Sequence, residues 1–148
     1  MDSYTELLYL GKIALAALMG GVVGIEREFA DKPAGFRTHM LVCATSSFVV
    51  ILAKLMVSSF DAQNDISADP IRLIEAIVVG ISFLGAGTIL KYNREKSVEG
   101  LTTSASILSV AAIGIAVALD AYILAVGVTL LDLFVNWGVS YMITKSLE

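Results

Sequence analysis

The chain alternates between long apolar segments and short clusters of charged residues, prolines and glycines. A helix needs about 20 mostly apolar residues to cross a hydrocarbon layer of about 30 Å. Five segments approach this length, and the charged side chains between them would be costly in lipid. The pattern predicts an all-α, polytopic membrane protein, a bundle of about five transmembrane helices. The predicted helices cover residues 7–25, 38–58, 71–90, 101–119 and 121–143.

The composition supports this prediction. Of the 148 residues, 57% are hydrophobic and 16% are charged, whereas soluble domains contain about 45–50% apolar and about 25% charged residues. The net charge of −4 argues against nucleic-acid binding, which needs clustered lysines and arginines. The sequence has no motif of an activated nucleophile and no phosphate-binding glycine loop, so we expect no enzymatic activity. We expect a single transmembrane domain over residues 1–148, without a soluble C-terminal domain.

The distribution of charge predicts the orientation of the bundle. Lysine and arginine favour the cytoplasmic side of a membrane. Basic residues occur in segments 27–37 and 91–96 and in the C-terminal tail, while acidic residues dominate the N-terminus and segment 61–69. Because these segments alternate along the chain, we expect the N-terminus outside and the C-terminus in the cytoplasm.

Polar residues within the predicted helices are candidates for function, because ionisable groups at membrane depth usually face protein or water. Asp132 lies near the middle of the fifth helix and has either a structural hydrogen-bonding role or a role in binding ions or protons. Glu75 lies about one turn into the third helix, where it either reaches the outer surface or contributes to a site. Spacings of three and four residues place Asp132 in a polar stripe that comprises Tyr122, Ala125, Thr129, Asp132, Asn136 and Ser140.

Small residues predict where the helices approach one another, because association in lipid depends on close packing rather than on burial from water. A backbone that lines a permeation path is the alternative interpretation. The small-residue faces contain Gly20, Gly21 and Gly24 in the first helix, Gly80, Gly85 and Gly87 in the third, and Ala105, Ser109, Ala112 and Ala116 in the fourth.

His39 and Cys43 are four positions apart and share one face of the second helix, an arrangement compatible with two ligands of a transition metal. No third or fourth ligand is evident nearby, so we favour a packed histidine and an ordinary buried cysteine. Because Cys43 is the only cysteine, an internal disulfide is excluded.

Three motifs resemble those of the MgtC/SapB family of bacterial membrane proteins. The first is GGVVGIERE at residues 20–28, which continues as KPAGFRTHMLV over residues 32–42. The second is GISFLGAGTI at residues 80–89, and the third is GLTTSASI at residues 100–107. The motifs occur in the order and at the spacing of the family and cover most of the chain from Gly20 to about Gly114.

The resemblance implies a protein of the bacterial inner (plasma) membrane that acts in magnesium homeostasis and, in pathogens, in virulence. Within the first motif, Glu26, Arg27, Arg37 and Thr38 match the polar core of the family. A short loop brings these residues to the same membrane surface, so we expect Glu26 to pair with Arg37. The pair is either a structural latch or a contact site for an ion, a lipid headgroup or a partner protein. The candidate partner- or ion-binding residues are thus Glu26, Arg27, Arg37, Thr38, Glu75, Asp132 and Asn136.

Two functions are compatible with these features, and a third possibility is a subunit without activity of its own. The best-studied members of the family resemble small regulators that bind other membrane proteins, including the F-type ATP synthase, so regulation by direct helix contact is the first hypothesis. The alternative is a transporter or channel for magnesium or another divalent cation that acts as an oligomer. Magnesium prefers oxygen ligands, and Glu26 and Asp132 are the first candidates to supply them. We expect a homo-oligomer such as a dimer, the lipid bilayer as surroundings and no cofactor other than magnesium.

Overall fold

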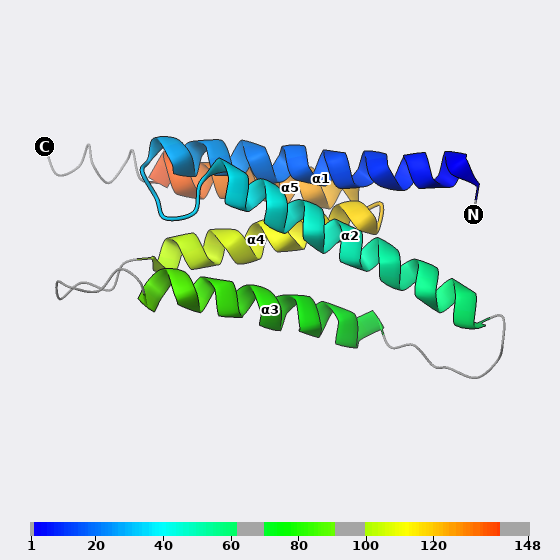
Figure 1. Cartoon of the computed structure of the whole chain (residues 1–148). Coiled ribbons are helices and arrows are strands. Elements are labelled where there is room, and N and C mark those ends of the chain that lie inside the picture. The colour runs from blue at the N-terminus through cyan, green and yellow to red at the C-terminus, as the bar shows by residue number, and fades with distance from the viewer. Residues whose placement is uncertain (1, 62–69, 91–99, 140–148) are drawn as a thin grey trace, which may run out of the picture.

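The computed structural model describes residues 2–61, 70–90 and 100–139. All regular secondary structure in these ranges is helical, which confirms the predicted all-α class. Figure 1 shows that successive helices run in alternating directions along the bundle. Their bounds are Ser3–Phe29 for α1, Phe36–Asp61 for α2, Pro70–Leu90 for α3, Leu101–Ala118 for α4, Tyr122–Leu133 for α5 and Phe134–Val139 for the π-helix η1, which continues α5.

Four of the described helices, α1 to α4, are long and apolar enough to cross a membrane. Together, α5 and η1 form a shorter apolar helix over Tyr122–Gly138, close to the lower limit of about 17 residues for a spanning helix. These helices indicate a multi-pass membrane protein. The end of the predicted fifth helix, including Ser140, lies outside the described residues, as do most of the acidic segment 61–69, the basic segment 91–96 and the C-terminal tail. The orientation therefore stays a prediction.

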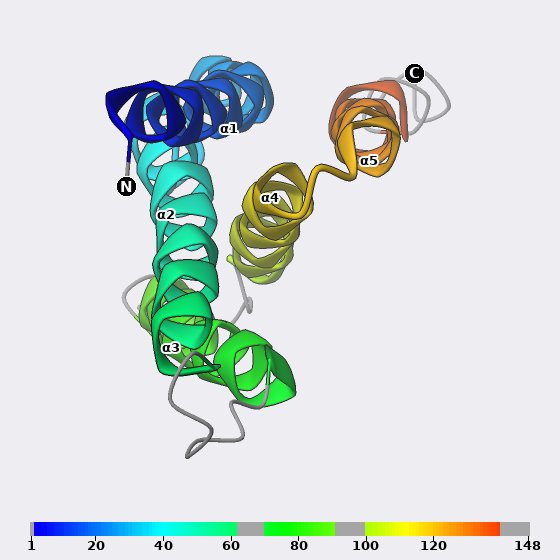
Figure 2. The ribbon, with the colours of Figure 1, turned by 90° about the vertical axis from the view of Figure 1, so that its right-hand side faces the viewer.

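The central helix of the described bundle is α4, which contacts each of the other four α-helices. Figure 2 shows it between α2 and α5. Half of the residues in its spanning segment are buried, compared with a third in α1 and in α2 and 6% in α3. Its buried face carries compact apolar side chains such as Val110, Ile113 and Val117. Consequently α1, α2 and α4 form the core of the bundle.

The three core helices approach one another closely at Cys43 of α2. A Cβ atom added to Gly20 of α1 would lie 2.6 Å from the Cβ of Cys43, and one added to Gly114 of α4 would collide with the carbonyl oxygen of Cys43. Gly21 and Gly24 similarly leave room for the first turns of α2. Because Cys43 is completely buried between two glycines, only a small residue fits at its position.

Only some of the small residues predicted to pack on α3 and α4 contact another helix in the structure. A Cβ atom added to Gly85 of α3 would lie 3.2 Å from the Cβ of Ser104 in α4. One added to Gly80 or Gly87 would meet no atom of the described residues within 4 Å, so that face of α3 is open in this part of the structure. Larger apolar residues occupy the core side of α4, and two members of its predicted stripe are exposed instead, Ala105 and Ala112.

Two aspartates occupy the left-handed backbone conformation just after a helix, a position that glycine usually takes. Asp31 follows α1 with a φ of 53°, and Asp120 follows α4 with a φ of 64°. After α4, the N–H of Ala121 donates a hydrogen bond of 2.9 Å to the carbonyl of Ala116, and the corresponding bond forms after α1. These bonds satisfy the last helical carbonyls and reverse the chain within a few residues.

We predict that Gly114→Ala destabilises the protein, because the new methyl group has to displace the backbone of α2 at Cys43. Overpacking of this kind costs about 1–3 kcal/mol. Gly127→Ala in α5 is the matched control, since a Cβ atom there would meet no atom within 4 Å. The control should be neutral or stabilising by up to about 1 kcal/mol. Thermal unfolding in detergent, followed by circular dichroism, measures both effects, and equal midpoints would contradict the close packing at Cys43.

Candidate functional site

Polar side chains gather near both ends of the bundle, and the first group surrounds Arg27 in the last turns of α1. The side chain is almost fully buried, since Arg27 is only 3% exposed. Its Nη1 donates a hydrogen bond of 3.0 Å to Oδ1 of Asn136 in η1 and lies 3.5 Å from Oε2 of Glu26. A buried guanidinium needs such partners because its removal from water is costly. The structure thus brings together Glu26, Arg27 and Asn136, which we call the Arg27 cluster.

Asp132 lies about one turn before Asn136 and faces α4. The hydroxyl of Ser109 donates a hydrogen bond of 2.9 Å to Oδ1 of Asp132. Residues four apart on a helix have Cβ atoms about 5–6 Å apart, so Asp132 extends the polar surface from the Arg27 cluster towards the middle of the bundle. The π-helix begins between the two residues, at Phe134, and short π-helical segments occur frequently at functional sites.

Several buried atoms in this region have no hydrogen-bond partner in the described structure. They include Nε of Arg27, Oε2 of Glu26 and Oδ2 of Asp132. A buried polar atom without a partner costs about 1–3 kcal/mol, and more when it is charged. The concentration of such atoms between α1, α4 and α5 makes this region the candidate functional site.

His39 joins two of the core helices through both nitrogens of its ring. Nδ1 lies 2.8 Å from the carbonyl oxygen of Gly35, and Nε2 lies 2.9 Å from the hydroxyl oxygen of Ser106 in α4. Neither nitrogen points towards Cys43 as a shared metal site would require, and within the described ranges no three His, Cys, Asp or Glu side chains form a cluster that could hold a metal ion. The arrangement gives His39 a structural role between α2 and α4.

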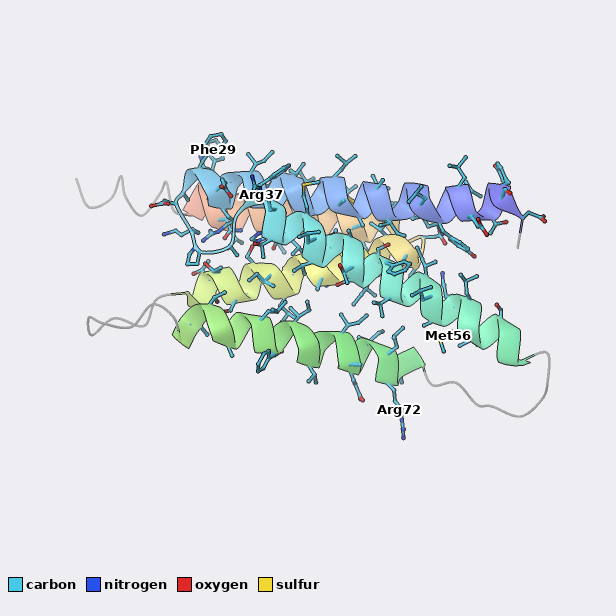
Figure 3. The ribbon with its side chains drawn as sticks, in the orientation of Figure 1. Phe29, Arg37, Met56 and Arg72 are labelled. Atoms are coloured by element: carbon cyan, nitrogen blue, oxygen red, sulfur yellow. The ribbon has the colours of Figure 1, made fainter. Side chains whose placement is uncertain are left out.

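The expected pair between Glu26 and Arg37 does not form. Glu26 lies beside Arg27 instead, while Arg37 and its neighbour Thr38 are exposed in the first turn of α2 (Figure 3). The loop is closed by Glu28, whose Oε2 accepts a hydrogen bond of 2.9 Å from the N–H of Phe36. The loop therefore uses a carboxylate to cap the start of α2, which satisfies a backbone donor that the helix leaves unpaired.

The second polar group surrounds Asp120 in the turn between α4 and α5. Nζ of Lys12 in α1 lies 2.7 Å from Oδ1 of Asp120, and Nζ of Lys54 in α2 lies 4.0 Å from Oδ2. Lys54 also donates a hydrogen bond of 2.9 Å to the carbonyl of Ala118, and the hydroxyl of Tyr122 donates one of 2.8 Å to Asp120. The hydrogen bonds from Lys12 and Tyr122 hold the pKa of Asp120 below its ordinary value. This Asp120 cluster ties α1 and α2 to the turn.

Glu75 belongs to neither cluster. It is exposed on α3 and forms no ion pair with any other residue that the structure describes. Beside it, Ala76 and Gly80 line an apolar groove of about 440 Å³ between α2 and α3. Leu41 and Val49 line the opposite wall of this groove.

The sequence did not identify Ser106, Ser109 and Lys54 as the partners of His39, Asp132 and Asp120. Ser106 and Ser109 recur at a spacing of three in α4, but this spacing alone does not reveal which helices they face. Lys54 is an isolated charge in an apolar helix, which is the kind of signal that identified Asp132. Its link to Asp120 depends on tertiary structure, because the two residues are far apart in the sequence.

Comparison with known proteins shows several relatives, and the model of the MgtC family matches residues 13–144. SapB of Bacillus subtilis (strain 168) is 36% identical over 113 residues, which are 76% of this chain and 48% of that protein. The Escherichia coli (strain K12) protein named "Putative magnesium transporter YhiD" is 34% identical over 127 residues, 86% of this chain and 58% of that protein. MgtC of Brucella abortus (strain 2308) is 39% identical over 103 residues, 70% of this chain and 39% of that protein. The chain spans about half the length of the curated relatives it matches, and no solved structure matches it.

We predict that Asp120→Asn lowers the melting temperature by a few degrees at neutral pH, because the ion pair with Lys12 is lost while asparagine still tolerates the positive φ. Asp31→Asn is the matched control, since Asp31 has the same backbone conformation and no ion pair within the described residues.

The effect of Asp120→Asn should also depend on pH. The pKa of Asp120 is lowered by folding, so the contribution of its charge to stability is present above the unfolded value of about 3.9 and is lost as the pH falls through the folded pKa. Melting curves should therefore converge only below about pH 4. A difference that persists unchanged in stronger acid would contradict this.

We predict that Asn136→Leu destabilises the protein by about 1.5–3 kcal/mol, because a hydrogen bond to a buried charged group is removed. Arg27→Met in the same chain should restore part of the loss, since the guanidinium that lacks its acceptor is then absent. Arg37→Met serves as the control for loss of an arginine, because Arg37 is exposed. Chemical unfolding of the single and double variants measures the coupling, and strictly additive effects would show that the two side chains do not interact.

Proposed function

The chain belongs to the MgtC family, and we propose that it serves in adaptation to low magnesium by regulating another membrane complex through direct helix contact. The name of the relative YhiD connects that protein with magnesium. The resemblance of the three motifs to those of the family favours a regulatory function. The proposal includes a bacterial inner-membrane location, an N-terminus outside, a homo-oligomer and the F-type ATP synthase as the partner that the resemblance implies.

The open face of α3 is the observation that carries this proposal. Only 6% of its spanning segment is buried, and a Cβ atom at Gly80 or Gly87 would meet no atom within 4 Å. Glycines on an exposed face let the backbone of a second helix approach closely. The exposed carboxylate of Glu75 adds a polar group, which at membrane depth is stabilised by contact with protein or water. A partner helix packed against Gly80 and Gly87 would satisfy the first feature, while Glu75 lies on a different face of α3.

Transport of magnesium is the second candidate function, and the name of YhiD favours it. Glu26 and Asp132 are carboxylates of the same region, as a magnesium site would require. Between Asp132 and the Asp120 cluster, however, the side chains of Ile113, Val117 and Ala125 are buried in the core. A path for a hydrated ion through one copy would have to displace these side chains, so regulation is the function that the geometry supports better.

We predict that Gly80→Leu abolishes the contribution of the protein to growth in low magnesium, because the new side chain blocks the groove and the close approach of a partner helix. Gly127→Leu is the matched control, since both glycines have open space at the Cβ position. Both variants should reach the membrane and fold with wild-type melting temperatures. Growth of a deletion strain that carries each variant is the measurement, and equal growth of the two would contradict docking on α3.

Site-specific photo-crosslinking tests the same face directly in cells. A photoreactive amino acid replaces Phe83 of α3, which is 82% exposed, or Ile123 of α5, which is 89% exposed and serves as control. We expect a discrete protein adduct at Phe83 in magnesium-limited cells, which disappears when Gly80→Leu is added, and no such adduct at Ile123. Identical adducts at both positions would mean that α3 has no preferred partner.

A further inference from the structure

We propose that Asp132 is a proton-binding site that water reaches from the end of the bundle that holds the Arg27 cluster and not from the end that holds the Asp120 cluster. The inference concerns the interior of a single copy of the chain. It therefore goes beyond the proposed function and does not depend on a partner.

The buried atoms without a hydrogen-bond partner at Arg27, Glu26 and Asp132 match water better than they match a metal ion, although Oε2 of Glu26 also lies 3.5 Å from Nη1 of Arg27. Nε of Arg27 is a donor, whereas Oε2 of Glu26 and Oδ2 of Asp132 in their ionised forms only accept hydrogen bonds. A water molecule accepts from the donor and donates to the carboxylates, whereas a metal ion cannot accept the hydrogen bond from Nε. Buried water is found where it satisfies two to four polar groups of the protein. The atoms thus point to water, and to the proton that water delivers, as the ligand.

A polar route connects Asp132 with the nearer end of the bundle. Asn136 lies about one turn closer to that end and accepts the hydrogen bond from Arg27. Beyond them, 17% of the side chain of Glu26 is exposed, next to the loop in which Lys32 is exposed. Polar side chains thus lie between the α1–α2 loop and the level of Asp132, and we infer that water follows them to Oδ2.

In the opposite direction the route is closed. Thr129 lies about one turn beyond Asp132, is buried, and donates its hydroxyl hydrogen to the carbonyl of Ala125 at 2.8 Å. Ala125 and Val117 are completely buried and belong to the same apolar core. The hydroxyl of Thr129 is thus used within its own helix, and the next layer of the bundle offers apolar side chains to water.

Few titratable groups of the described structure face Asp132. The helix that bonds to it, α4, has no titratable side chain and contributes only the hydroxyl of Ser109. The titratable groups on the helices around Asp132 are Arg27 and Glu26 of α1, His39 of α2, and Tyr122 at the far end of α5. The ring of His39 is hydrogen-bonded to Ser106 and does not reach Asp132.

Proton uptake forms an O–H bond at Oδ2 of Asp132 and turns the carboxylate into the neutral acid. A hydronium ion in the route supplies the proton and remains as water, and Oδ1 keeps the hydrogen bond from Ser109. Glu26 remains the carboxylate that lies beside Arg27. The protonation state of Asp132 thereby changes the charge balance at the point where α1 meets α5 and η1.

Cysteine accessibility tests the route of water. In a Cys43→Ala background, a membrane-impermeant thiosulfonate is added to either side of sealed liposomes, with Phe29→Cys as the marker for one end and Tyr4→Cys for the other. We expect Asp132→Cys to react from the Phe29 side and Thr129→Cys to react at least about tenfold more slowly from both sides, because a thiol in apolar surroundings stays protonated. Reaction of Asp132→Cys from the Tyr4 side, or from neither side, would overturn the proposed route.

Proton binding is tested on the wild-type chain, so that the result does not depend on how a variant folds. Dicyclohexylcarbodiimide attacks protonated carboxyl groups in apolar surroundings, and mass spectrometry locates the adduct. We expect Asp132 to be labelled at low pH, less as the pH rises, and not at all in Asp132→Asn, while the ion-paired Asp120 stays unlabelled. Labelling that is absent or independent of pH, in protein that keeps its helix content, would limit Asp132 to structural hydrogen bonding and overturn the proposal.

Discussion

The bundle depends on the close approach of three helices at Cys43. In lipid, burial of apolar side chains does not drive helices together, so van der Waals contact between closely spaced backbones has to do so. Gly20 and Gly114 provide that contact on the two sides of α2. His39, one turn away on α2, adds a hydrogen bond to Ser106 that sets α4 in register with α2. Once α4 is held in this way, the position of the α4–α5 turn and of Ser109 follows.

The polar clusters occupy two levels on either side of this packed centre. On α1, Arg27 lies fifteen positions after Lys12, a rise of about 22 Å at about 1.5 Å per residue, which is less than the hydrocarbon thickness of about 30 Å. Charges at these levels lie close to or within the apolar layer, and Lys12 and Arg27 are each paired with a group from another segment of the chain. The level at Asp120 fastens the helices together, whereas the level at Arg27 retains buried atoms without hydrogen-bond partners. This asymmetry is why the functional site is assigned to the Arg27 end.

Much of the fold, but less of the site, was predictable from the sequence. The apolar segments reveal α1 to α4 because lipid requires long runs without charge, and the glycines of the first motif correctly indicate where α1 meets α2. The expected pair between Glu26 and Arg37 was wrong because proximity to the same loop does not determine side-chain direction. The carboxylate of Glu26 lies beside Arg27, and it is Glu28 that accepts the hydrogen bond from the N–H of Phe36. The bonds of Asp132 to Ser109 and of Arg27 to Asn136 join residues far apart in the chain, and local patterns contain no information about such pairs.

We propose that this member of the MgtC family regulates a partner and does not itself carry magnesium. This is tested by the flux of magnesium into sealed liposomes that contain the purified, folded protein and an internal magnesium-sensitive dye. We expect no flux above that of empty liposomes, with or without Asp132→Asn. Flux that saturates with magnesium concentration and falls in Asp132→Asn or Glu26→Gln would contradict it and make the protein a transporter.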